Sequence, residues 1–244
     1  MHPDVLTWNV IGAAVGVAVV HTALGPDHSL PFVALARARH WSRTRTLTVA
    51  AACGAAHVAA SLALGLFGVL AGVAVGALDG LESGRGGIAA WALVAVGAAY
   101  SLWGVRRGCR ARRGIALHRH DRHGRDASHG HGHLHVHAGA GAAHEHPQPG
   151  GERTSWALFL VFVLGPCEPL IPLFVLPASQ GRWALAGAAA AAFAVATITT
   201  MLGIVALALA GAERLPLGPL ERWSHALAGV VIAGSGLAVA LGGL

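Results

Sequence analysis

The sequence predicts an all-α, polytopic membrane protein with six transmembrane helices. More than half of the 244 residues are hydrophobic and only 11% are charged. Six apolar stretches reach the length of about 20 residues that a helix needs to cross a bilayer. Two of these stretches contain related helix-breaking motifs, which divide the chain into two halves. We therefore expect two inverted three-helix repeats, with broken helices in the first and fourth spans.

The six predicted spans are separated by polar segments. They cover residues 8–36, 46–77, 88–105, 156–176, 183–211 and 223–241. Tryptophans mark the span edges, where an amphipathic ring is most stable at the boundary between lipid and water. These are Trp8, Trp91, Trp103, Trp156, Trp183 and Trp223. The predicted organisation is a first repeat over 1–105, a loop over 106–153 and a second repeat over 154–244.

The distribution of arginines predicts the orientation of the chain, which contains no lysine. Arginines crowd into the segments 37–45, 106–153 and 214–222, which all fall on one predicted side. Only Arg85 and Arg182 fall on the other side. By the positive-inside rule, the long loop is cytoplasmic and both termini lie outside a bacterial-type inner membrane. The net charge of +6 therefore reflects topology, and binding of nucleic acid is not needed to explain it.

The repeat is visible in two short segments. Residues 25–32 read Gly-Pro-Asp-His-Ser-Leu-Pro-Phe, and residues 165–174 read Gly-Pro-Cys-Glu-Pro-Leu-Ile-Pro-Leu-Phe. Each half contains three spans, an odd number, so the two halves must enter the membrane in opposite senses. Inverted repeats of this kind place the site of many transporters at mid-membrane, where broken helices meet.

Proline in these segments frees backbone carbonyl groups. Pro26 cannot donate to the Thr22 carbonyl, and Pro166 cannot donate to the Phe162 carbonyl. In hydrocarbon an unsatisfied carbonyl is costly, so irregular backbone survives only against protein, water or an ion. A bound cation would meet this requirement.

The side chains near the two breaks indicate a transition metal. Imidazole, carboxylate and thiolate groups together suit nickel, cobalt or zinc better than sodium or magnesium. In an unbroken helix His21 and His28 would lie about 10 Å apart, too far for one ion, and a break can bring them together. We expect a metal pathway formed by His21, Asp27, His28, His57, Cys167 and Glu168. Polar contacts that only tie helices together remain the alternative, and Thr197, Thr199 and Thr200 are expected to bond their own helix.

The loop between the repeats carries a second metal-binding signal. Its centre has alternating histidines at positions 129 to 137, namely His129, His131, His133, His135 and His137. Such a tract is a multidentate chelator, and the composition predicts a disordered loop in the absence of metal. A cytoplasmic chelator could collect ions for export or buffer ions after import. We expect export slightly more than import.

The chain resembles the nickel/cobalt transporters and their urease-accessory-like relatives in the lysine-exporter-like superfamily. The resemblance rests on His21-x3-Gly-Pro-Asp27-His28, on His57, on Gly165-Pro-Cys167-Glu168-Pro and on the histidine tract. It covers all six spans and implies an inner-membrane carrier with His21, Asp27, His28 and His57 in the metal path. A Gly-Pro step precedes Asp27 where the uptake group has an Asp-Ala type of step, so metal identity and direction stay open.

Other classes fit less well. A transmembrane thiol–disulfide electron carrier would need a cysteine in each half, but the first repeat has Asp27-His28 where the second has Cys167-Glu168. A small-solute or amino-acid exporter would not call for the histidine tract. The His-Glu-x-x-His motif of an intramembrane metalloprotease is absent, and we predict no enzymatic activity.

The predicted partners are the lipid bilayer, divalent metal ions and protons as coupling ions, because metal ligands must be deprotonated. The stripe Gly68-x3-Gly72-x3-Gly76 permits close helix packing within a subunit or between subunits of a homo-oligomer.

Overall fold

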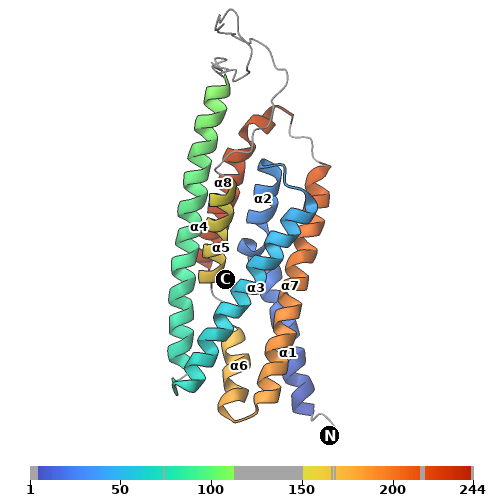
Figure 1. Cartoon of the computed structure of the whole chain (residues 1–244), viewed down its shortest axis with the longest axis vertical. Coiled ribbons are helices and arrows are strands. Elements are labelled where there is room, and N and C mark those ends of the chain that lie inside the picture. The colour runs from blue at the N-terminus through green and yellow to red at the C-terminus, as the bar shows by residue number, and fades with distance from the viewer. Residues whose placement is uncertain are drawn as a thin grey trace, which may run out of the picture.

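The computed structural model describes residues 5–73, 75–112, 151–165, 167, 169–214 and 218–242. Its regular elements are all helical (Figure 1). In chain order they are α1 (Val5–Leu24), η1 (Pro26–His28), α2 (Leu30–Ala38), α3 (Arg43–Leu70), α4 (Val75–Arg112), α5 (Gly151–Leu164), α6 (Leu170–Ser179), α7 (Trp183–Glu213), η2 (Gly218–Trp223) and α8 (Ser224–Gly242). The predicted all-α class is therefore confirmed for this part of the chain.

Both predicted helix breaks are present. The helix α1 ends at Leu24, Gly25 is extended, and Pro26 opens a single 3-10 turn before α2 begins at Leu30. In the second half, α5 ends at Leu164 and α6 begins at Leu170. Each break begins with a Gly-Pro pair in the sequence, and the missing proline N–H interrupts the helical hydrogen bonds.

Five helices are long and apolar enough to cross a membrane. They are α1, α3, α4, α7 and the helical segment Leu220–Gly242, which contains α8. The predicted span over 156–176 is divided between α5, with 14 residues, and α6, with 10 residues. Neither piece alone reaches the length of about 20 residues that a bilayer requires. Helix length therefore supports five of the six predicted spans.

The helices α4 and α8 pack closely along their length. A Cβ atom added at Gly97 or Gly104 of α4 would collide with the backbone of α8, and one at Gly229 or Gly236 would collide with α4. Small residues allow such close backbone approach, which favours helix association where lipid supplies no hydrophobic driving force. By contrast, Gly68 of the predicted glycine stripe lies in α3 and packs against Leu78 of α4, and Gly72 and Gly76 have no neighbour within 4 Å of an added Cβ atom.

The buried apolar residues form separate clusters around the breaks. Phe193 of α7 anchors one cluster with residues of α1, α3 and α6. Phe162 of α5 joins a second cluster with Phe32 of α2 and Met201 of α7. Leu35 of α2 packs with residues of α4 and α8 in a third. Many large apolar side chains face outward, as expected for a lipid-facing exterior.

Candidate metal centre

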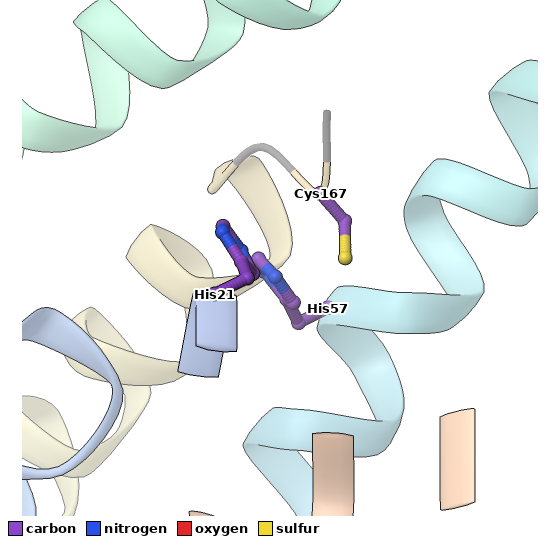
Figure 2. A group of neighbouring side chains, drawn as sticks. All are labelled: His21, His57 and Cys167. Atoms are coloured by element: carbon purple, nitrogen blue, oxygen red, sulfur yellow. The ribbon is translucent and has the colours of Figure 1, made fainter. Parts of the chain in front are cut away.

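Three side chains of types that can ligate metals, from distant parts of the sequence, meet inside the bundle. His21 lies in the last turn of α1, His57 in the middle of α3, and Cys167 in the break between α5 and α6. Figure 2 shows the three side chains gathered in one place. One ligand atom from each lies within 4.8 Å of the others. We call these three residues the metal cluster.

The break after α1 adds a fourth donor beside the metal cluster. The His28 ring centroid lies 5.0 Å from that of His21 and 5.4 Å from that of His57, in edge-to-face arrangements. His28 and His57 are each only 3% exposed, and Cys167 is fully buried. The predicted approach of His21 and His28 across the break is therefore observed.

The second break fixes the orientation of His57. Pro166 is predicted to deprive the Phe162 carbonyl of its helical donor, and that oxygen accepts from the Gly165 N–H at 3.2 Å and lies 3.2 Å from His57 Nδ1. A carbonyl only accepts, so Nδ1 carries the proton and Nε2 keeps its lone pair. The Nε2 atom is buried and has no hydrogen-bond partner among the described residues. A second-shell bond of this kind is how proteins orient metal-binding imidazoles.

The first break fixes His28 in a similar way. Its Nδ1 lies 3.0 Å from Asp27 Oδ1, and a carboxylate accepts, so Nδ1 carries a proton. His28 Nε2 is also buried without a partner in the described part of the chain. Gly25 makes room for this contact, because a Cβ atom there would collide with His28 Nδ1 and with Asp27 Oδ1.

The arrangement suits a borderline transition metal. His21 Nε2 is a third buried imidazole nitrogen without a partner within the described segments. Metal–ligand bonds of about 2.0–2.3 Å place tetrahedral ligands roughly 3.3–3.8 Å apart. The 4.8 Å limit of the metal cluster therefore requires a closure of about 1 Å, which side-chain rotation can supply. Imidazole and thiolate ligands are those that zinc, nickel and cobalt accept.

The remaining predicted site residues fall into two groups. Asp27 is close to the metal cluster, but its carboxylate bonds His28 and it is not one of the three grouped ligands. Glu168 lies outside the described residues. So do the loop histidines His129, His131, His133, His135 and His137.

The threonines of α7 behave in two ways. Thr199 Oγ1 donates to the Val195 carbonyl at 2.7 Å, as predicted for a residue that bonds its own helix. Thr197 is fully buried, and its Oγ1 has no partner in the structure as described, so the same prediction is wrong for Thr197.

An ion pair that was not predicted from the sequence lies beside the second break. Glu82 of α4 is fully buried, and its Oε1 lies 3.0 Å from Arg85 Nη1. Arg85 Nη2 donates to the Val163 carbonyl at 2.9 Å. The predicted third span began at Ile88, which placed both residues outside the membrane, whereas the apolar helix extends over Val75–Cys109. The opposite charges at a spacing of three residues were the available signal.

Comparison of the chain with protein-family models, with curated protein sequences and with solved structures finds no match in any of the three.

Proposed function

We propose that this protein is a membrane transporter of divalent transition-metal ions, with nickel and cobalt favoured over zinc. The observation that carries the proposal is the buried meeting of His21, His57 and Cys167, with His28 beside them, at two breaks in apolar helices. Ionisable groups at such positions in membrane proteins mark ion pathways.

The state of the imidazole nitrogens supports metal binding over a purely structural role. If these histidines only tied helices together, their ring nitrogens would be satisfied by hydrogen bonds. Instead, His21, His28 and His57 each keep Nε2 buried without a partner within the described segments. A buried polar atom without a partner costs about 1–3 kcal/mol. A metal ion bound at the metal cluster would offset that cost at each of these nitrogens that it contacts.

The course of the helices supports two inverted repeats. In Figure 1, α1, α3 and α4 run in directions opposite to those of α5, α7 and α8 respectively. The helix contacts show the same correspondence between α1–α4 of the first half and α5–α8 of the second. The contact of α1 with α7 corresponds to that of α5 with α3, and the contact of α2 with α8 corresponds to that of α6 with α4. In this proposal α5 and α6 together make the sixth span, as α1 and α2 make the first. Such repeats place the substrate between their broken helices.

The arginines support the proposed orientation. The connection between α2 and α3, the end of α4 and the end of α7 lie at one end of the bundle (Figure 1). These segments carry most of the described arginines, whereas Arg182 lies in the turn between α6 and α7 at the other end. By the positive-inside rule the arginine-rich end is cytoplasmic. The loop that carries His129 to His137 follows α4, so a cytoplasmic chelator and export of the ion are the favoured arrangement.

The mechanism that follows is alternating access. The two repeats rock about the metal cluster, which opens to one side of the membrane at a time. Because ligands must lose protons to bind metal, protons exchange with the metal ion. The resemblance to nickel/cobalt transporters belongs to the same proposal.

The test is metal flux in proteoliposomes with labelled nickel, cobalt and zinc under an imposed pH gradient. The unmodified protein is compared with a combined His28→Ala, Glu168→Ala variant. Flux that needs the unmodified site and changes with the pH gradient supports a proton-coupled metal carrier. Absence of flux for all three metals would contradict the proposal.

A further inference from the structure

A small cavity adjoins the metal cluster on the side of α4. Its volume is about 20 Å³, and Asp27 and His57 line it together with Gly165 in the second break. Its other walls are small or apolar residues of α4, α5 and α8, among them Ala90 of α4. A cavity needs about 10–15 Å³ to hold one water molecule. The space beside Asp27 is therefore large enough for one water molecule or one bare metal ion.

The ion pair of Glu82 and Arg85 lies one helical turn from this cavity along α4, because Glu82 precedes the lining residue Gly86 by four residues and Arg85 precedes the lining residue Ala89 by four. The Val163 carbonyl that Arg85 binds belongs to the residue that follows the lining residue Phe162. The Val163 carbonyl would bond the N–H of Cys167 if α5 continued, so the break leaves that oxygen in need of a donor. Arg85 supplies the donor and so ties α4 to the broken end of α5.

Glu82 holds Arg85 in that position. Its side chain is fully buried, whereas that of Arg85 is 23% exposed. A fully buried carboxylate is stable only when it is paired, and removal of one partner of such a pair is strongly destabilising. The Glu82 carboxylate and the Val163 carbonyl are also oxygen ligands that a divalent cation can use. The positively charged side chain of Arg85 thus binds the oxygen atoms that a metal ion could otherwise contact.

We infer that the cavity lined by Asp27, His57 and Ala90 is the passage between the metal cluster and one side of the membrane, and that Arg85, positioned by Glu82, is its gate. With Arg85 on the Val163 carbonyl, α5 is held against α4 and the passage is closed. Release of that bond lets the broken end of α5, with Cys167 beyond it, move away from α4. The inference rests on the proposed transport function, but its test uses no metal.

The test measures access to Cys167 with a small cationic methanethiosulfonate reagent. The chain has three cysteines, so Cys53→Ala and Cys109→Ser leave Cys167 as the only target in the full-length protein. In this background, Glu82→Gln with Arg85→Gln removes both charges; glutamine has the shape of the glutamate that it replaces and is shorter than arginine, so it does not reproduce the bond to the Val163 carbonyl. We expect Cys167 to react about tenfold faster, because the open state moves from a minor towards a major population.

A second substitution separates an open passage from a loosened fold. Ala90→Leu adds bulk at the cavity wall and should return the labelling rate of the double-glutamine variant close to that of the parent. The matched control is Ala95→Leu on an exposed face of α4, which should leave the faster rate unchanged. Unfolding would accelerate labelling with either leucine. An unchanged rate in the double-glutamine variant, or equal rates with leucine at 90 and at 95, would overturn the inference.

The outcome is separable from that of the transport proposal. If the labelling rates change as expected in the variants of Glu82, Arg85 and Ala90, but the protein transports none of the three metals, the passage and its gate are supported and the proposed transport of metal ions is contradicted. If the protein transports metal but the labelling rate of Cys167 does not change in these variants, the transport proposal is supported and the gate is contradicted.

Discussion

The two helix breaks begin with the same Gly-Pro pair but satisfy their polar groups differently. In the first break, His28 bonds its neighbour Asp27, so the contact is local in sequence. In the second break, the Phe162 carbonyl bonds His57 of α3 and the Val163 carbonyl bonds Arg85 of α4. The side-chain bond of the first break is thus local, whereas the second break has local backbone bonds, such as that from the Gly165 N–H to the Phe162 carbonyl, and also side-chain bonds from other helices. We expect the second break to move more readily, since its side-chain restraints lie on separate helices.

The largest expected effect is that of His57→Ala, which removes a ligand and also a donor to the second break. The Phe162 carbonyl keeps the Gly165 N–H as a donor but loses the bond to His57, so the free energy of unfolding should fall by about 0.5–1.5 kcal/mol. Metal affinity should fall at least about 100-fold, since loss of second-shell support alone costs 10–100-fold. Calorimetric titration with nickel and thermal unfolding in detergent measure the two effects.

The matched variant His57→Gln separates the two roles of His57. Its amide can still donate to the Phe162 carbonyl, so stability should recover in part while metal affinity stays low. Recovery of metal binding in the glutamine variant would show that His57 acts only as a structural donor.

The next effect tests the second break alone. Cys167→Ser should weaken metal binding about 10-fold or more, because a hydroxyl is a harder and poorer ligand than a thiolate for these metals. Cys53→Ser is the control, since Cys53 is also fully buried but packs in the apolar cluster of Phe162 and Met201. Absorption bands from cobalt–thiolate bonding report the result directly. Loss of such bands in the Cys53 variant, with retention in the Cys167 variant, would contradict the assignment.

The substitutions Gly25→Ala and Gly165→Ala compare how much stability each break loses when a methyl group is added. At Gly25 a Cβ atom would collide with His28 and Asp27, whereas at Gly165 it would lie 3.2 Å from the Phe162 oxygen and 3.3 Å from His57 Nδ1. We expect Gly25→Ala to cost about 1–3 kcal/mol in stability, and Gly165→Ala to cost less. Gly16→Ala, where nothing lies within 4 Å, should be neutral or stabilising. Thermal unfolding of the three variants ranks their losses of stability. A larger loss in Gly165→Ala than in Gly25→Ala would contradict the expected order.

The smallest effect is expected from a change that touches neither break. Deletion of 128–146 removes the alternating histidines His129 to His137 but leaves both breaks intact. Apparent metal affinity in flux assays should shift by a few-fold, with the maximal rate unchanged, because a chelator alters the local supply of ions. Complete loss of flux would show that the loop takes part in opening the pathway.

Much of this site could be predicted from single residues and their spacing. Two Gly-Pro pairs inside apolar runs indicated both breaks, because proline removes a helical donor wherever it lies. His21 and His28 were expected to approach across the first break for the same local reason. The partner of the Phe162 carbonyl was predicted only as a need, and its identity as His57 depends on how α3 packs against α5.

The sequence by itself determined the helical class, the apolar exterior and the positions of the two breaks, since these depend on composition and on local backbone chemistry. Only the tertiary structure decided that His21, His57 and Cys167 share one place, and that Glu82 and Arg85 lie against α5. The physical reason is that such contacts join residues far apart in the chain. Their distances are set by helix packing, through close contacts such as those of Gly97 and Gly229 between α4 and α8.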